Sequence, residues 1–177
     1  MDEIYLKLPK HKKSKANCVF MNAKGEVIGS FKRTLKNRKQ VFLDIIALYE
    51  LVIINFSIFN KFNDLTASIE ENFTYLRKSM WTIKDHTKNQ IGAIKQSSLL
   101  KSKSFKVFDI TLDGQLLQLK SINSGEYVFI SNNEIIATIK DIDNSKIFAE
   151  NYKINFNCDQ DLALLLTTIF YLFLITS

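Results

Sequence analysis

The sequence closes on DQDLALLLTTIFYLFLITS, residues 159–177, and the environment of this stretch decides the fold. Its apolar part, Leu162–Ile175, is 14 residues long and is interrupted by two threonines. As a helix rising 1.5 Å per residue it would span about 21 Å, less than the roughly 30 Å of a bilayer's hydrocarbon core. The length therefore favours a helix buried in protein over one that crosses a membrane.

The residues before this segment support the same interpretation. Asp159 and Asp161 stand where a membrane anchor usually carries Lys or Arg. An Asp at a helix N-cap accepts hydrogen bonds from free amide groups and suits the positive end of the helix dipole. Because the helix has no polar face, it must be enclosed on all sides. We therefore expect the rest of the chain to surround it.

The body of the chain supplies such a wall. Five segments each combine a strand rich in aromatic and β-branched residues, a polar turn and a second short strand: residues 18–32, 56–70, 81–95, 105–120 and 127–140. Lys24-Gly25 and Asp113-Gly114 are the clearest turns. With further strands at Ile4–Leu8 and Ile147–Phe156, the sequence predicts about twelve strands in hairpin order, with no crossover helix.

A sheet of this size tends to curl or close, because closure removes its exposed edges. Closing it around Leu162–Ile175 would bury both the inward strand residues and the helix. The predicted fold class is therefore mostly β: a closed antiparallel β-barrel of about twelve strands, wrapped around a hydrophobic C-terminal α-helix. We expect a single domain over residues 1–177, with a basic N-terminal strand or arm at 1–17 and the central helix at 159–176.

Residues 41–59, VFLDIIALYELVIINFSIF, fit this scheme less simply. We predict a short helix around 40–50 that leads into a strand near Ile53–Phe59. The alternative is a two-pass membrane protein, in which this run and the tail both span lipid. That alternative would submerge Asp44 and Glu50, and a carboxylate in a membrane is costly without a partner.

Composition and cysteine usage suggest the compartment. The chain has one Pro, five Gly and 46% hydrophobic residues, as expected of one globular domain without a linker. Cys18 and Cys158 have no metal-binding spacing, so we interpret them as reduced, buried thiols. The N-terminus lacks the apolar segment of a secretory signal. The expected location is the cytoplasm, with the membrane surface as a further option.

The charge is unevenly distributed. Residues 1–40 carry 11 Lys and Arg against 3 Asp and Glu, a net of +8, whereas residues 41–177 carry 13 against 15, a net of −2. Basic patches attract anionic partners, although Lys-rich loops can also be merely solvated. The candidate residues for binding an anionic headgroup lie in two predicted loops: Lys10, Lys12, Lys13, Lys32, Arg33, Lys36, Arg38 and Lys39.

The sequence does not predict an enzyme. His11 and His86 lack the neighbours that would indicate a reaction, and no phosphate-binding loop or nucleophile motif is present. Asp141 and Asp143 are better explained by a turn than by a metal site, and Trp81 by the core or the rim of a barrel. We expect no catalytic residues, no metal and no cofactor.

The hairpins follow the pattern aromatic-x-Ile-x-Asp-x-x-Gly-x-x-Ile-Gly-x-Ile, and Asp-x-Asp-Leu-Ala-Leu-Leu-Leu follows at 159–166. Together these patterns resemble the tubby C-terminal-like superfamily, which includes tubby proteins, LURP-one-related proteins and phospholipid scramblases. The resemblance covers most of residues 18–176. It implies a twelve-stranded barrel threaded by a hydrophobic helix.

The resemblance also bears on function, because tubby proteins bind phosphoinositides. We expect a non-enzymatic binding module, whose partner is an anionic membrane surface or a phosphorylated ligand. The alternative is a barrel that binds another protein. Scramblase-like lipid transfer is suggested by the resemblance alone. Nucleic acid is disfavoured, since the basic loops lack a platform of aromatic residues for stacking.

Overall fold

The structure, a computed structural model, describes residues 2–8, 16–35, 40–41, 54–72, 80–97, 106–142 and 151–176. These residues contain twelve strands and one long helix, α2 (Gln160–Ile175). The strands are β1 (Asp2–Lys7), β2 (Cys18–Met21), β3 (Val27–Thr34), β4 (Asn55–Asn60), β5 (Leu65–Asn72), β6 (Met80–Asp85), β7 (Gln90–Gln96), β8 (Val107–Leu112), β9 (Gln115–Asn123), β10 (Glu126–Ser131), β11 (Glu134–Asp141) and β12 (Asn151–Phe156).

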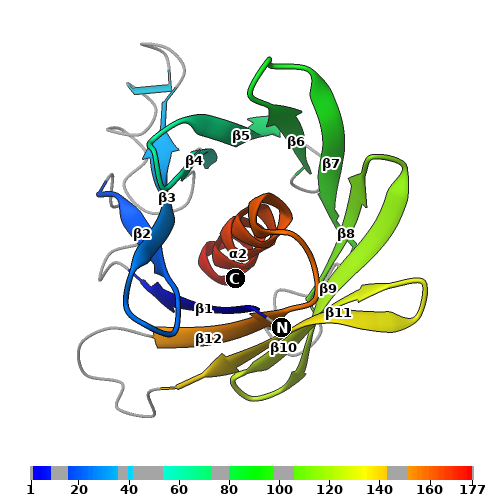
Figure 1. Ribbon diagram of the computed structural model, residues 1–177. Helices are drawn as coiled ribbons and strands as arrows, with labels where there is room; N and C mark the ends of the chain where they lie inside the picture. The colour runs from blue at the N-terminus through cyan, green and yellow to red at the C-terminus, as the bar shows by residue number, and fades with distance from the viewer. Residues whose placement is uncertain are drawn as a thin grey trace.

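All twelve strands form one closed antiparallel barrel, and each strand pairs with its neighbours in the sequence. The barrel closes where β1 pairs with β12, from Asp2 opposite Phe156 to Lys7 opposite Asn151. The other side of β1 pairs with β2. The predicted fold class is confirmed, and Figure 1 shows α2 inside the ring of strands.

The five predicted hairpins are all present, as β2–β3, β4–β5, β6–β7, β8–β9 and β10–β11. Three of their turns share one construction, in which an Asn or Asp side chain accepts a hydrogen bond from the backbone amide four residues later. The acceptors are Asn22, Asn60 and Asp85. Each of these turns has a positive φ angle three residues after the acceptor, which suits Gly25 but costs more at Asn63 and Lys88.

These five turns lie at the same end of the barrel as the start of α2. We call it the hairpin end and define it by residues 22–26, 60–64, 85–89, 113–114, 132–133 and 157–161. It carries six Asp and Glu against three Lys. The end where α2 finishes is called the opposite end. The segments that join β1 to β2 and β3 to β4 leave the barrel there, as follows from the strand directions.

The helix α2 is the core of the barrel, and all residues from Ala163 to Leu174 are buried. Its N-cap is Asp159, whose Oδ1 accepts a hydrogen bond from the backbone amide of Leu162 at 3.0 Å. The buried Thr167 hydroxyl donates to the carbonyl oxygen of Ala163 at 2.8 Å, and the buried Thr168 hydroxyl donates to that of Leu164 at 2.9 Å. Side-chain hydroxyls inside an apolar barrel are thus satisfied within the helix itself.

Aromatic side chains connect the helix to the wall on two sides. Tyr171 packs against Phe31 and Phe56, with ring centroids 5.1 and 5.5 Å away. On another side Phe170 contacts Tyr127 and Tyr152, with centroids 5.0 and 4.9 Å away. Such tilted and edge-on pairs add to the stabilisation from burial. Within the described residues, no helix is both long and apolar enough to cross a membrane.

Gly29 lets strand β3 approach the helix near the hairpin end, because a Cβ atom added to it would lie 2.8 Å from Cδ1 of Leu164 in α2. Ala67 in β5 and Gly92 in β7 occupy the same position after their turns. At Gly92 the close neighbour is the carbonyl oxygen of Thr111 in β8 and not the helix. The small residue therefore has a packing reason at Gly29 and at Gly92, but the neighbour differs.

The remaining predictions for single segments have mixed outcomes. The strand expected near Ile53–Phe59 is confirmed as β4, whereas the helix expected around 40–50 falls almost wholly outside the described residues. Trp81 lies in the core with none of its surface exposed, and the thiol of Cys18 is buried while that of Cys158 is half-buried. Both cysteines are free.

Candidate functional site

The structure describes two of the eight predicted headgroup-binding residues, Lys32 and Arg33. Both lie in strand β3 and not in a loop. Lys32 is exposed, and its Nζ lies 5.0 Å from the centroid of the Phe59 ring. The other six lie outside the described residues: Lys10, Lys12, Lys13, Lys36, Arg38 and Lys39.

Arg33 faces the inside of the barrel and is only 5% exposed, so its predicted place in an exposed basic loop is wrong. Strand alternation explains the difference, because Phe31 points inward and β3 continues through Arg33. The charge of Arg33 counteracts the rise that burial causes in the pKa of Glu71 and in that of Tyr171. Arg33 therefore acts as an interior charge near the opposite end, and a ligand on the outer surface does not reach it.

Glu71 is held in place by the backbone amide of Ile54, just before β4, and by the side chain of Asn55 at the start of β4. Its Oε2 accepts a hydrogen bond from the amide of Ile54 at 2.7 Å, and its own amide donates to Oδ1 of Asn55 at 2.8 Å. Burial raises the pKa of Glu71, and the Ile54 amide and the Arg33 charge oppose that rise. These contacts stabilise polar groups in the interior and do not form a surface site.

A second buried cation stabilises the end of the helix. Lys106 is 1% exposed, and its Nζ donates to the carbonyl oxygen of Phe173 and to the hydroxyl of Thr176, each at 2.6 Å. The ammonium also lies over the rings of Phe108 and Phe173, 4.9 and 4.7 Å from their centroids. A cation here complements the negative end of the helix dipole. This role was not predicted, since Lys106 stands at the start of the predicted hairpin 105–120, directly after a Lys- and Ser-rich stretch, and nothing local indicates that it meets the helix.

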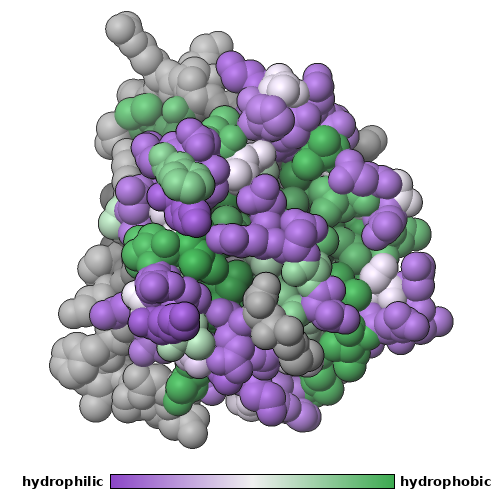
Figure 2. Space-filling model, in the orientation of Figure 1, coloured by the Kyte–Doolittle hydropathy of each residue, from purple (hydrophilic) through white to green (hydrophobic). Residues whose placement is uncertain are grey.

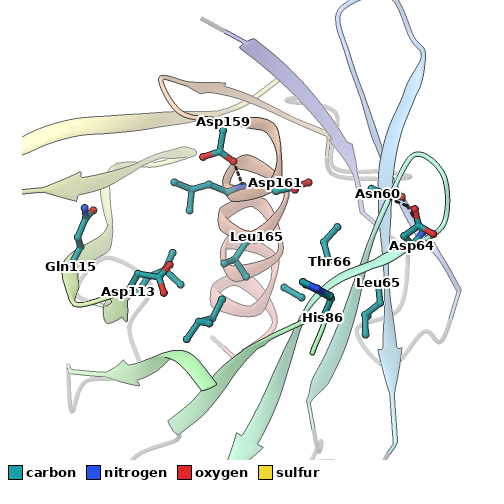
Figure 3. A pocket seen from close by; sticks show the side chains of 14 residues that line it. Asn60, Asp64, Leu65, Thr66, His86, Asp113, Gln115, Asp159, Asp161 and Leu165 are labelled. Atoms are coloured by element: carbon teal, nitrogen blue, oxygen red, sulfur yellow. Dashed lines mark hydrogen bonds between the residues drawn. The ribbon is translucent and has the colours of Figure 1, made fainter. Parts of the chain in front are cut away.

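The hairpin end contains a cavity of about 450 Å³ that is open to solvent. It lies between the first turns of α2 and the β4–β5, β6–β7 and β8–β9 hairpins (Figure 3). Apolar side chains form its floor: Leu65, Ala67, Ile91, Leu112, Leu162 and Leu165. Polar side chains form its walls and mouth: Asn60, Asp64, Thr66, His86, Asp113, Gln115, Asp159 and Asp161.

Acidic residues dominate the cavity. Four aspartates line it and no Lys or Arg does. Two of them have local partners: Asp159 caps α2, and Asp64 accepts a hydrogen bond from the side-chain amide of Asn60 at 3.3 Å. Within the described part of the chain, no group donates a hydrogen bond to the carboxylate of Asp113 or Asp161, and no cation forms an ion pair with either. Figure 3 shows Asp113 and Gln115 on one side of Leu165, and His86 and Thr66 on the other.

This arrangement does not suit a metal ion. In the parts of the chain that the structure describes, no group of three His, Cys, Asp or Glu residues is close enough to hold one. Two large apolar side chains stand exposed near the hairpin end, Phe62 at 73% in the β4–β5 turn and Leu116 at 68% on the outer face of β9. On the face shown in Figure 2, hydrophobic side chains lie interspersed among hydrophilic ones. The cavity therefore combines negative charge with apolar surface.

The sequence placed His86 and Asp113 in turns, which the structure confirms, but it did not predict that they share a cavity. One signal was available, because every second connection in an all-antiparallel barrel lies at the same end. The five hairpin turns and the start of the helix, which follows the twelfth strand, therefore lie at one end of the barrel. Which turns face the helix across a cavity depends on how the barrel closes, and the sequence pattern does not specify that.

Comparison with known proteins agrees with the fold. No curated protein matches this chain. Among solved structures, the X-ray structure of a protein from Arabidopsis thaliana is similar, with a TM-score of 0.58 and 10% identity over 97% of this chain and 89% of that one. At this identity the likeness shows the fold alone. The family model for the Tubby C-terminal like domain matches residues 5–176. The chain belongs to the Tubby C-terminal like domain family.

Proposed function

We propose that this protein is a non-enzymatic binding domain that attaches to anionic surfaces, such as phospholipid headgroups, through the opposite end of the barrel. The observation that supports it best is the excess charge of +8 in residues 1–40, of which one positive charge belongs to the buried Arg33 and does not face a surface. The two basic clusters fall in or beside the segments that join β1 to β2 and β3 to β4, and both segments leave the barrel at that end. Each Lys or Arg near an anionic membrane contributes about 1 kcal/mol.

The filled barrel supports an outer binding surface over an inner one. Because α2 is buried from Ala163 to Leu174, it occupies the space that a ligand would fill in a hollow barrel. The exposed Lys7 and Lys32 extend positive charge along β1 and β3 toward the basic segments. The expected location is the cytoplasm, at the membrane surface when bound.

Co-sedimentation with vesicles tests this proposal. We expect the protein to pellet with phosphatidylserine-containing vesicles and not with pure phosphatidylcholine vesicles, and to be released by high salt. The triple variant Lys36→Glu/Arg38→Glu/Lys39→Glu should lose this binding. A matched control, Lys24→Glu/Lys61→Glu/Lys88→Glu, makes the same change of charge at the hairpin end and should retain it. Equal pelleting with both kinds of vesicle would refute the proposal.

The alternative is a module that binds another protein. The acidic cavity and the exposed Phe62 and Leu116 favour it, because an anionic membrane would repel that end of the barrel. A partner protein that stays bound at high salt, and whose binding persists after charge reversal at Lys36, Arg38 and Lys39, would support this alternative over membrane binding.

A further inference from the structure

We propose that the cavity at the hairpin end binds a lysine side chain from an extended segment of a partner protein, with apolar residues on either side of that lysine. This inference does not depend on membrane binding, which concerns the opposite end of the barrel. It rests on three features: the uncompensated charge of the cavity, its apolar floor and the exposed apolar residues near the hairpin end.

The charge selects a cation. With four aspartates and no Lys or Arg in its lining, the cavity carries a formal charge of −4 before His86 is considered. Capping of α2 accounts for Asp159, and the dipole of α2 favours Asp161. Asp113 belongs to the β8–β9 turn, where its φ angle of 47° suits an Asp, and it lines the same cavity. Carboxylates from the helix and from the wall therefore converge on a cavity that no side chain of the described residues neutralises.

The floor selects a cation with an apolar stem. Leu65, Ile91 and Leu165 line the cavity together with the carboxylates, and Leu165 is 5% exposed. A small hydrated ion would leave this surface unused. A lysine side chain places four methylene groups against apolar surface while its ammonium stays at the polar rim. The cavity volume of about 450 Å³ lies within the range of about 300–1,000 Å³ that is typical of ligand sites.

The exposed apolar residues near the hairpin end favour a peptide over a free amine. Phe62 lies in the β4–β5 turn between the lining residues Asn60 and Asp64, where the Nζ of Lys61 lies 4.9 Å from the centroid of its ring. Leu116 is the neighbour of the lining residue Gln115 in β9, and strand alternation places its side chain on the outer face of the barrel. These two side chains are 73% and 68% exposed, so they offer apolar contacts outside the cavity. A free diamine ends at its second ammonium, whereas a peptide continues on both sides of a bound lysine and can extend toward these side chains.

The test uses the full chain and four probes, with binding followed by backbone amide NMR. The probes are acetyl-Leu-Lys-Leu-amide, its norleucine analogue without the charge, acetyl-Gly-Lys-Gly-amide without the apolar neighbours, and 1,5-diaminopentane. We expect the first peptide to bind tightest and to shift the amide signals of Asp113, Asp161 and Leu165. The double variant Asp113→Asn/Asp161→Asn should weaken it by about two- to fivefold for each carboxylate, as for exposed ion pairs.

Matched variants separate this site from a general effect of charge. Glu26→Gln/Glu134→Gln removes the same charge from exposed positions that do not line the cavity, and it should leave binding unchanged. Equal binding of the norleucine peptide, or no effect of Asp113→Asn/Asp161→Asn, would overturn the inference. Tighter binding of the diamine than of the first peptide would overturn the peptide assignment. Vesicle binding should be the same in all these variants, so failure here is distinguishable from failure of the membrane proposal.

Discussion

Replacing Gly29 by Ala should destabilise the protein, although the substitution adds only one methyl group. The new Cβ would lie 2.7 Å from the carbonyl oxygen of Phe59 and 2.8 Å from Cδ1 of Leu164. Overpacking of this kind costs about 1–3 kcal/mol, and the reduced entropy of the unfolded chain returns about 0.4–1 kcal/mol. The net loss is therefore between about 0 and about 2.6 kcal/mol, with a midpoint of about 1.3 kcal/mol, which corresponds to roughly 3–5 °C in melting temperature for a chain of this size. Urea unfolding followed by circular dichroism measures it.

A double-mutant cycle identifies the cause. Leu164→Ala alone should cost about 2–5 kcal/mol, because it leaves a cavity in the core. Combined with Gly29→Ala it should cost at least about 0.5 kcal/mol less than the sum, since the contact of the new methyl group with Leu164 is removed while that with the Phe59 carbonyl oxygen remains. Gly92→Ala serves as the control, because its Cβ would meet the carbonyl oxygen of Thr111 at 2.2 Å and not the helix. The reasoning is refuted if Gly29→Ala stabilises the protein, or if Leu164→Ala relieves Gly92→Ala equally well.

Three further predictions concern the helix cap, a buried thiol and a turn. Asp159→Ala should lower the free energy of unfolding by about 0.5–2 kcal/mol, because the amide of Leu162 loses its cap, while Asp159→Asn should retain most of it in the same urea titration. Burial raises the pKa of the Cys18 thiol to about 11 from 9.0, so at pH 8 it should react with a disulfide reagent roughly a hundredfold more slowly than an ordinary thiol; fast labelling of Cys18 in a Cys158→Ser variant would contradict this. Hydrogen bonds from Thr87 and from the Asn89 amide lower the pKa of Asp85 below 3.8, so its contribution to stability is present above pH 3.8 and is lost as the pH falls through the lower, folded-state pKa. Asp85→Asn should therefore flatten the acid side of the stability profile, and an unchanged profile would show that this carboxylate is not linked to folding.

Much of the fold could be predicted because its signals are local. Asn, Asp and Gly at the turns of the five repeated segments specify hairpins, and the alternation of residues such as Phe108 and Ile110 specifies which side of a strand faces the core. The helix was recognisable because an all-apolar segment with an Asp cap needs an enclosure. Local chemistry of this kind does not depend on how the barrel closes.

The interior charges and the cavity could not be predicted in this way. Arg33 belongs to a run of basic residues that is typical of a loop, and only the continuation of β3 past Phe31 turns its side chain inward. Lys106 is buried because it meets the last turn of α2, from which it is separated by nearly 70 residues. Contacts of this range depend on barrel register, which is set by the whole structure.

The central position of α2 has a consequence for how the protein is made. The helix follows all twelve strands in the sequence, so during synthesis every strand leaves the ribosome before the segment that fills the barrel. The closing pair is also the most distant one, since β1 must wait for β12. Strands with inward apolar residues and open edges are prone to aggregate while they wait. A growing chain of this design is therefore exposed to aggregation until α2 has left the ribosome and can fill the barrel.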